Sequence, residues 1–384
     1  MGLSAVESRW VDRFDELHHA ACERMGGLDD FGDDAYHEGL RVLLGALDAK
    51  PPSPLQAGAA RELIVSALAS RLHTEAQWAA HPAYRSREIP RPLVVIGVPR
   101  TGTTALHNLL SQDPQFQGIE KWLCHAPLVR PPVREWDAHP QYQACAAGVE
   151  HMFAIAPEVM KAHGVLASAV DECLVPMSQS FTCNWIPSQL DVPDYDRWFM
   201  DSDETASFRR YKDVLRLVGL KDDRPWLLKN PSHVFGIEAM LAVFPDACVV
   251  QTHRNPVDSL ASVVNLLGNF MFAFTGEHID RARLLARETA FWAAAVKRTM
   301  AAQDRQPDRF VNILQPDIRR DPLGVVRKIY DTFGFTLSEE AEARMLAWAA
   351  SNSDAAGDGH QYAKLTDEGP IRAAFAEYMD RLGF

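Results

Sequence analysis

From residue 92 onward, short apolar runs alternate with amphipathic segments of helical period, and no other feature constrains the fold as strongly. The runs are almost continuously apolar, which is typical of parallel strands buried on both faces. Parallel strands need a crossover between them, usually a helix, so the sequence predicts an α/β fold with a parallel sheet flanked by helices. The predicted strands are LVVIG (93–97), WLLK (226–229), CVVQT (248–252) and FVNIL (310–314), and the helices are TTALHNLL (103–110), HVFGIEAMLAVF (233–244), VDSLASVVNLL (257–267) and LGVVRKIYDTF (323–333).

The remaining chain is predicted to be mostly helical. Residues 4–72 have a helical pattern that AKPPSPLQ (49–56) breaks in two, and we expect residues 1–88 to form a helical N-terminal elaboration of an α/β domain at 89–384. The segment at about 121–204 is rich in Trp, Pro, Met and His, and it is expected to form a helical cap over the sheet edge. Asn230-Pro231, Asn255-Pro256 and Asp321-Pro322 each combine a helix N-cap residue with proline at the first helical position.

Composition favours a globular protein of the cytoplasm. The formal net charge of -12 argues against nucleic-acid or membrane-surface partners, and no segment reaches the roughly 20 apolar residues of a membrane span. The charged N-terminus lacks the apolar core of a signal peptide. The six cysteines form no C-x-x-C pair, so reduced thiols are expected rather than a zinc site or disulfides.

The loop GVPRTGTT, between the first predicted strand and its helix, resembles a nucleoside-triphosphate loop with one change. Gly97, Gly102 and Thr104 fit G-x-x-x-x-G-K-[ST], but Thr103 stands where the lysine belongs. Backbone N–H groups from about 100 to 104 suit a phosphate or sulfate at a helix N-terminus, and the hydroxyls of Thr101, Thr103 and Thr104 add donors.

Basic residues follow three of the predicted strands: Arg100, Lys229 and Arg254. The carboxyl ends of parallel strands meet at one edge of the sheet, where ligands bind, so these cations indicate an anion site. Ser262, two turns into the next helix on its predicted polar side, could share an anion with Arg254. Two separated anion sites favour a ligand with two separated anionic groups. The third predicted strand ends without an acidic residue, so no metal ion is expected.

These motifs resemble those of the sulfotransferases that use 3'-phosphoadenosine 5'-phosphosulfate (PAPS). GVPRTGTT is similar to their 5'-phosphosulfate loop, and RNPVDSLAS is similar to their 3'-phosphate motif, with Arg254 and Ser262 at the family's spacing. GHQYAKL (359–365) resembles a donor-side loop of a bacterial branch, which would add His360 and Tyr362. The resemblance implies a P-loop-like fold, PAPS as donor, adenosine 3',5'-bisphosphate as product, and no metal.

Sulfuryl transfer builds negative charge on the leaving phosphate oxygen, and cations there stabilise the transition state. We expect Lys229 at the bridging or leaving oxygen and Arg100 on the 5'-phosphate. The match of LLKNP to the family's strand-end lysine supports the role of Lys229.

An acceptor hydroxyl or amine must lose a proton, so a general base is expected near the sulfur. Glu120 is the first candidate, because QFQGIE (115–120) reads as a further strand ending at the same edge. Many bacterial relatives carry Trp-Glu here, whereas this chain has Glu-Lys-Trp at 120–122. Glu172, His125 and His163 are the alternatives.

The cap contains the aromatic residues Phe181, Trp185, Trp198 and Phe199, and aromatic residues at this density are more often core. If they line a pocket instead, they favour a hydroxylated lipid, steroid-like or phenolic acceptor over a free sugar. Fold alone does not separate sulfuryl from phosphoryl transfer, so a P-loop kinase-like phosphotransferase is the alternative. A non-catalytic nucleotide-binding protein is a third reading, disfavoured because Lys229 and nearby base candidates are present.

Overall fold

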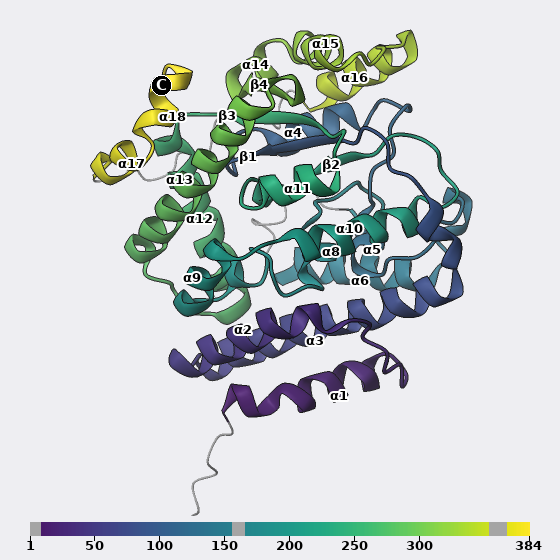
Figure 1. The fold of residues 1–384 in the computed structure, drawn as a ribbon, viewed down its shortest axis with the longest axis vertical. Helices are drawn as coiled ribbons and strands as arrows, with labels where there is room; N and C mark the ends of the chain where they lie inside the picture. The colour runs from purple at the N-terminus through teal and green to yellow at the C-terminus, as the bar shows by residue number, and fades with distance from the viewer. Residues whose placement is uncertain (1–8, 156–165, 353–366) are drawn as a thin grey trace, which may run out of the picture.

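The computed structural model describes residues 9–155, 166–352 and 367–384. Its sheet has four parallel strands in the order β2-β1-β3-β4 (Figure 1). The strands are β1 (Leu93–Gly97), β2 (Leu227–Lys229), β3 (Cys248–His253) and β4 (Phe310–Leu314). Each of the four strands predicted at these positions is confirmed, and β1 lies between β2 and β3.

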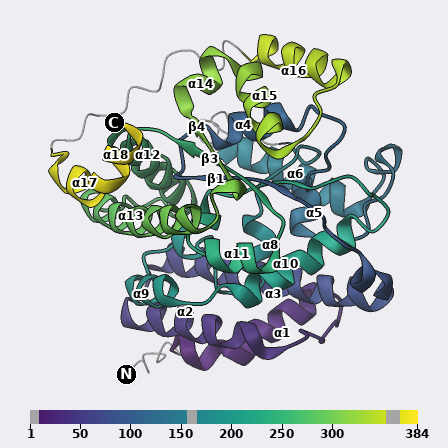
Figure 2. The same cartoon turned by 45° about the horizontal axis from the view of Figure 1, so that its top comes forward.

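Helices cover both faces of this sheet, as the continuous apolar strands predict (Figure 2). Leu93 and Val95 of β1 belong to one hydrophobic cluster, and Val94 and Ile96 belong to another. Because successive side chains of a strand point to opposite faces, each cluster fills one side of the sheet. The first side is covered by α4 (Thr103–Leu110), α14 (Gln315–Arg320), α15 (Pro322–Phe333) and α16 (Glu339–Ser351). The second is covered by α10 (Thr205–Val218), α11 (Ile237–Val243) and α13 (Arg281–Arg305).

The predicted N-caps are confirmed at all three positions. The side chains of Asn230, Asn255 and Asp321 accept hydrogen bonds from the backbone N–H groups of residues 232, 257 and 324. Asn255 opens α12 (Pro256–Thr275), whereas Asn230 opens the short 3₁₀ helix η6 (Pro231–Val234) that precedes α11. These caps fix the point at which the chain leaves the carboxyl end of each strand.

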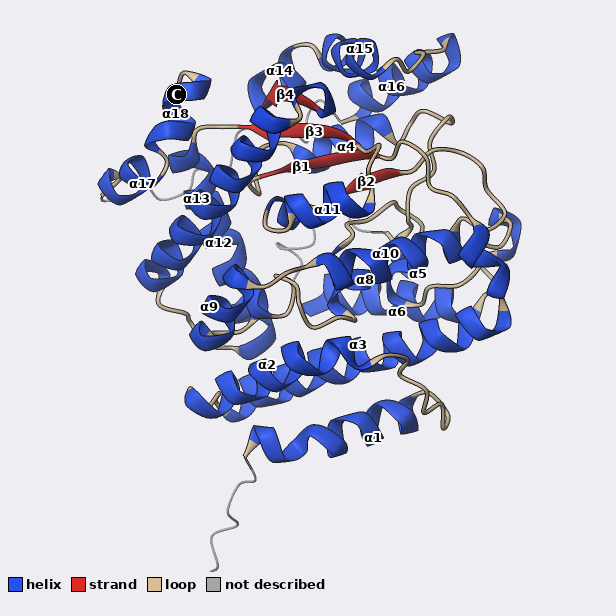
Figure 3. Cartoon of the chain, in the orientation of Figure 1, coloured by secondary structure: helices blue, strands red, loops and turns tan. Residues whose placement is uncertain are grey.

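The N-terminal helices are α1 (Phe14–Arg24), α2 (His37–Ala49) and α3 (Pro54–Ala80), with the 3₁₀ helices η1 (Trp10–Arg13), η2 (Asp34–Tyr36) and η3 (Pro82–Ser86). The predicted break separates α2 from α3, and Ser53 and Gln56 form a capping box there. A further break between α1 and α2 was not predicted. The three helices form a layer beneath the cap (Figures 1 and 3), and their buried residues belong to the same hydrophobic cluster as Val94.

The cap consists mainly of short helices and turns: α5 (Lys121–His125), η4 (Val133–Glu135), α6 (Pro140–Ile155), α8 (Leu174–Ser178), η5 (Pro187–Gln189) and α9 (Pro193–Asp201). The 3₁₀ helix η7 (Pro307–Arg309) precedes β4. After α16, the described chain ends with α17 (Gly369–Ala374) and α18 (Ala376–Leu382). Among the helices within the described ranges, none is long and apolar enough to cross a membrane.

The strand predicted at residues 115–120 does not form. Gln117 makes an isolated parallel bridge to Trp226, and Glu120 makes an isolated antiparallel bridge to Val170. Between them, the carbonyl of Gly118 accepts a hydrogen bond from the guanidinium of Arg130. The segment therefore contacts the edge of the sheet without continuing as a strand. As a result, Glu120 does not lie where the predicted strand would have placed it.

Candidate active site

The loop between β1 and α4 is shaped by residues in the left-handed backbone region. Gly97 has φ 145° and Gly102 has φ 93°. A Cβ at Gly97 would lie 2.6 Å from the carbonyl oxygen of Thr252, so no larger residue fits there without moving β3. Arg100 also has a positive φ, 70°, which is uncommon for a residue with a side chain. The loop delivers the N-terminus of α4, whose first N–H groups have no carbonyl partner within the helix, to the carboxyl end of the sheet.

The hydroxyl of Thr101 is used inside the protein, which corrects its predicted role as a side-chain donor to an anion. Its Oγ1 donates to the carbonyl of Val98 at 2.7 Å and lies 2.6 Å from Oγ1 of Thr252. Thr101 is completely buried, and Thr103 is only 3% exposed. Thr101 therefore attaches the loop to β3, and Thr104 is the hydroxyl of this loop that reaches Lys229.

The structure gathers the predicted cations and hydroxyls at the carboxyl ends of β1, β2 and β3. Nζ of Lys229 lies 3.2 Å from Oγ1 of Thr104. Nε of Arg100 donates to Oγ of Ser262 at 2.9 Å, and Nη1 of Arg254 donates to the carbonyl of Arg100 at 3.4 Å. These contacts connect the glycine loop to the start of α12.

Ser262 differs from its prediction in two respects. It is completely buried rather than on an exposed polar side of α12, and its hydroxyl accepts from Arg100 rather than from Arg254. The guanidinium of Arg100 reaches from the first loop to α12 and donates to this hydroxyl. Arg254 itself is partly exposed and lies 3.9 Å from the carboxylate of Asp258 on the next turn.

The carboxylate that contacts Lys229 belongs to Glu172, one of the alternative base candidates. The two side chains form an ion pair, and the lysine side chain is 3% exposed. The backbone holds this pair together, because the N–H of Cys173 donates to the carbonyl of Lys229 at 3.0 Å. Sequence reasoning ranked Glu172 below Glu120 because 115–120 was read as a strand ending at this edge, whereas a single glutamate in the cap is more often a surface or hydrogen-bonded residue.

Asp171 orients Glu172, and the sequence analysis missed it. Its carboxylate accepts from the N–H of Glu172 at 2.8 Å and pairs with Nζ of Lys121 at 2.9 Å. Burial acts to raise the pKa of Asp171, but Lys121, the N–H of Glu172 and Lys229 together hold this pKa below its ordinary value. Asp171 is therefore a stable anion that fixes the backbone beneath Glu172.

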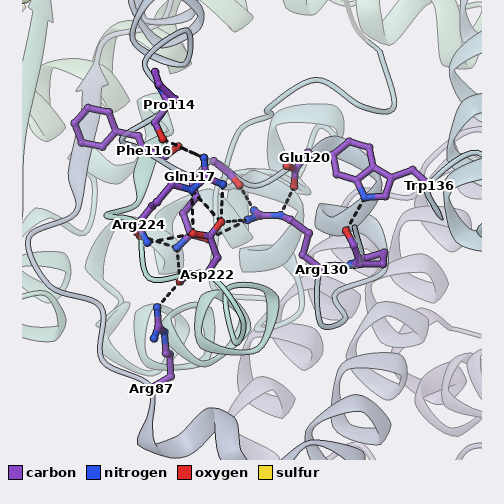
Figure 4. A network of polar contacts seen from close by, with 11 residues as sticks. Arg87, Pro114, Phe116, Gln117, Glu120, Arg130, Trp136, Asp222 and Arg224 are labelled. Atoms are coloured by element: carbon purple, nitrogen blue, oxygen red, sulfur yellow. Dashed lines mark hydrogen bonds and ion pairs between the residues drawn. The ribbon is translucent and has the colours of Figure 1, made fainter. Parts of the chain in front are cut away.

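Glu120, the first candidate for the base, forms an ion pair with Arg130 at 3.0 Å (Figure 4). The same guanidinium donates to Oε1 of Gln117 at 3.0 Å and pairs with Asp222 at 3.3 Å. Burial raises the pKa of Glu120, although Arg130 acts in the opposite direction. The carboxylate is thus part of a network below β2, because the chain at 115–120 leaves the sheet before it can deliver Glu120 to Lys229.

Of the remaining predicted site residues, His125 lies within the described ranges and the other three do not. His125 ends α5 with an exposed side chain, and its carbonyl accepts from Ser70 at 3.0 Å. His163, His360 and Tyr362 lie outside the described residues.

A second residue missed by sequence reasoning is His107, one turn after Thr103 on α4. It is 1% exposed, and its Nε2 is buried without a hydrogen-bond partner. Burial, with a smaller effect of Lys229, lowers the pKa of His107 to about 3, so the ring is neutral. Its helical spacing from Thr103 was the available signal, because residues four apart share one helix face.

The cap aromatics are mainly core, which is the more frequent of the two alternatives that the sequence left open, and the pocket alternative is not supported for them. Phe181 is completely buried and Phe199 is 2% exposed. Trp198 donates its ring N–H to Glu38 of α2 at 3.2 Å, and Trp185 packs against the same core. A cavity of about 200 Å³ lies elsewhere, between η5 and α9 of the cap and α12 and α13. Apolar and charged side chains both line it: Leu190, Met271, Leu284 and Phe291, and Asp191, Asp196, Arg197, Arg283 and Arg287.

Within the described ranges, no group of three or more histidine, cysteine, aspartate or glutamate side chains is arranged to hold a metal ion. The six cysteines, all of them described, are free thiols.

Comparison with known proteins gives a consistent result. Residues 92–339 match the Sulfotransferase family. The chain is 23% identical over 300 residues, 76% of this chain and 75% of the relative, to omega-hydroxy-beta-dihydromenaquinone-9 sulfotransferase Stf3 of Mycobacterium bovis and of Mycobacterium tuberculosis.

Two crystal structures are similar over almost their whole length. Sulfotransferase STF1 from Mycobacterium tuberculosis H37Rv is 34% identical, with a TM-score of 0.86 over 96% of this chain and 100% of that one. Sulfotransferase STF9 from Mycobacterium avium is 27% identical, with a TM-score of 0.85 over 99% of this chain and 98% of that one.

Proposed function

The chain belongs to the sulfotransferase family, and on this premise we propose that it transfers a sulfuryl group from PAPS to the hydroxyl of an apolar, lipid-like acceptor. The observation that carries the proposal is the convergence of Arg100, Lys229 and Arg254 from three strand ends on the N-terminus of α4. A protein of net charge -12 concentrates these cations where the family's donor would present its anionic groups.

The donor's 5'-phosphosulfate is proposed to bind at the α4 N-terminus, with Thr104 and the backbone N–H groups of the loop as donors of hydrogen bonds. Its 3'-phosphate is proposed to bind at Arg254 and Ser262. Arg100 contacts Ser262 through its guanidinium and Arg254 through its backbone carbonyl, so it connects the two proposed phosphate sites. The donor set consists of nitrogen cations and hydroxyls, which suits phosphate and sulfate oxygens without a bridging metal.

The chemistry is proposed to take place at the pair of Lys229 and Glu172. The acceptor oxygen forms a bond to sulfur as the bond from sulfur to the 5'-phosphate oxygen breaks, and the acceptor proton passes to the carboxylate of Glu172. Lys229 stabilises the charge that grows on the leaving oxygen, which becomes part of adenosine 3',5'-bisphosphate. Glu172 replaces Glu120 as the preferred base because it contacts Lys229, whereas Glu120 is bound to Arg130.

The acceptor proposal has two supports. The relative Stf3 is named for an acceptor that carries a hydroxyl on a dihydromenaquinone. The cavity between the cap and α12 and α13 presents the apolar side chains of Leu190, Leu284 and Phe291, and it is bordered by Met271 of α12, the helix that also carries Ser262.

A direct assay tests the function. The purified protein is incubated with PAPS and, separately, with a polyprenyl alcohol, a hydroxylated quinol, a simple phenol and an amino sugar, and products are analysed by mass spectrometry. We expect the mass of SO₃ to be added to the apolar alcohols. Parallel incubation with ATP and Mg²⁺ should give no phosphorylated product, and phosphorylation there without sulfation from PAPS would refute the proposal.

A further inference from the structure

The C-terminal helix α18 contacts the end of the strand that supplies Arg254. β3 ends at His253, directly before Arg254. Nδ1 of His253 lies 2.9 Å from the hydroxyl of Tyr378, a residue of α18 that is 125 positions further along the chain. Nε2 of His253 lies 2.8 Å from Oδ1 of Asn312 on β4. In Figures 1 and 2, α18 lies beside the end of β3, close to α12.

The chemistry of these groups fixes the direction of each hydrogen bond. His253 and Tyr378 are 3% and 2% exposed. Burial lowers the pKa of His253 to about 4, so its ring is neutral at pH 7, with one nitrogen donating and the other accepting. Oδ1 of Asn312 can only accept, so Nε2 of His253 donates to it and Nδ1 accepts from the Tyr378 hydroxyl. The Tyr378 oxygen also interacts with the backbone of Arg254.

Helix α18 is anchored independently of this contact. Arg381 pairs with Asp304 of α13 at 2.6 Å, and Phe375, just before α18, is 1% exposed in the main hydrophobic cluster. Tyr378 packs against Phe375 with ring centroids 5.9 Å apart. The tyrosine hydroxyl is therefore presented by a fixed element, and the backbone at the end of β3 is held against it.

The contacts that the side chain of Arg254 makes with Asp258 and Arg100, in contrast, are long. The side chain lies 3.9 Å from Asp258 and 3.4 Å from the carbonyl of Arg100, and it is 30% exposed. Because these contacts are weak, the position of the Arg254 guanidinium depends mainly on the backbone at residue 254. A shift at the end of β3 would thus move the guanidinium relative to Ser262 and the glycine loop.

We propose that Tyr378 is a positioning residue for the 3'-phosphate, acting through His253 and the backbone of Arg254, so that the C-terminal helix sets selectivity for 3'-phosphorylated nucleotides. The inference rests on the proposed binding of the 3'-phosphate at Arg254. Removing the hydroxyl leaves Nδ1 of His253 buried and unpaired and frees the start of α12 to shift.

The test compares two ligands that differ only in the 3'-phosphate. Titration calorimetry measures Kd for adenosine 3',5'-bisphosphate and for adenosine 5'-monophosphate on wild type and Tyr378→Phe. We expect Kd for the bisphosphate to rise roughly five- to tenfold and Kd for the monophosphate to stay within about twofold. The ratio of the two values within one preparation does not depend on the fraction of active protein.

Tyr330→Phe is the matched control, because Tyr330 of α15 is a buried tyrosine whose hydroxyl donates to Asp113 at 2.7 Å. It should lower thermal stability without changing the ratio. In an Arg254→Ala background, Tyr378→Phe should have no further effect on the ratio, because the two residues act on one contact.

The outcomes distinguish failure of the positioning role of Tyr378 from failure of the proposed 3'-phosphate site at Arg254. If Arg254→Ala changes the ratio and Tyr378→Phe does not, the positioning role is wrong and the 3'-phosphate site stands. An unchanged ratio in Arg254→Ala removes the 3'-phosphate site itself. Equal losses for both nucleotides in Tyr378→Phe would mean that the tyrosine is merely structural, and they too would overturn the inference.

Discussion

Replacing Glu172 by glutamine is the sharpest test of the proposed chemistry. The carboxylate forms an ion pair with Lys229, whose Nζ also lies 3.2 Å from Thr104 at the start of α4. Glutamine keeps the size of the side chain and an oxygen that can accept from Lys229, but it cannot take a proton. Loss of a general base costs about 10²–10⁴ in rate, so we expect kcat with an aliphatic alcohol to fall by at least 10²-fold.

The acceptor dependence of this loss identifies its cause. An acidic phenol ionises more readily than an alcohol and needs less help from a base, so its rate should fall much less. Affinity for adenosine 3',5'-bisphosphate should stay within a few-fold of wild type, because Glu172 is not assigned to the donor. The assay measures initial rates of sulfation for both acceptors at saturating PAPS, with calorimetry for the nucleotide.

Glu120→Gln is the matched control, since it makes the same chemical change at the carboxylate bound to Arg130. Arg130 keeps Gln117, the carbonyl of Gly118 and Asp222 as partners, and glutamine keeps an oxygen that can accept from it, so we expect the variant to fold and to show little change in rate. An unchanged ratio of alcohol to phenol rates in Glu172→Gln would refute its role as the base. A selective loss of alcohol sulfation in Glu120→Gln would restore the role predicted from the sequence.

Three further predictions concern the leaving group, the metal and pH. Lys229→Ala should lower turnover roughly 10²-fold with a much smaller change in donor affinity, and equal losses in both would contradict its leaving-group role. Adenosine 3',5'-bisphosphate should raise the Tm equally with and without EDTA, and loss of the shift in EDTA would indicate a metal. Burial raises the pKa of Glu204 to about 8, so the folded state keeps a proton that the unfolded state releases above a pKa of about 4.3. Stability should therefore fall as pH rises from about 5 to 8, and Glu204→Gln should flatten that fall in denaturant titrations at each pH; an unchanged slope would contradict the assignment.

The sequence by itself determined the sheet and its flanking helices. The four strands, the N-caps at 230, 255 and 321 and the glycine loop depend on local patterns: continuous apolar runs, cap residues before proline, and glycines where the backbone takes a positive φ. Because parallel strands end at one edge, the sequence also placed Arg100, Lys229 and Arg254 together without any knowledge of their contacts.

Only the tertiary structure decided which carboxylate accompanies the lysine. Glu120 and Glu172 both belong to segments without regular secondary structure, so no periodicity fixes where their side chains point. The outcome depends on partners distant in the sequence: Arg130 binds Gly118 and Glu120 and ends the strand pattern early, while the backbone of Cys173 pairs with Lys229 and brings Glu172 to it. In the same way, the contact of Tyr378 with His253 joins residues 125 positions apart, and it exists because the packing of α18 on the core places a hydroxyl there.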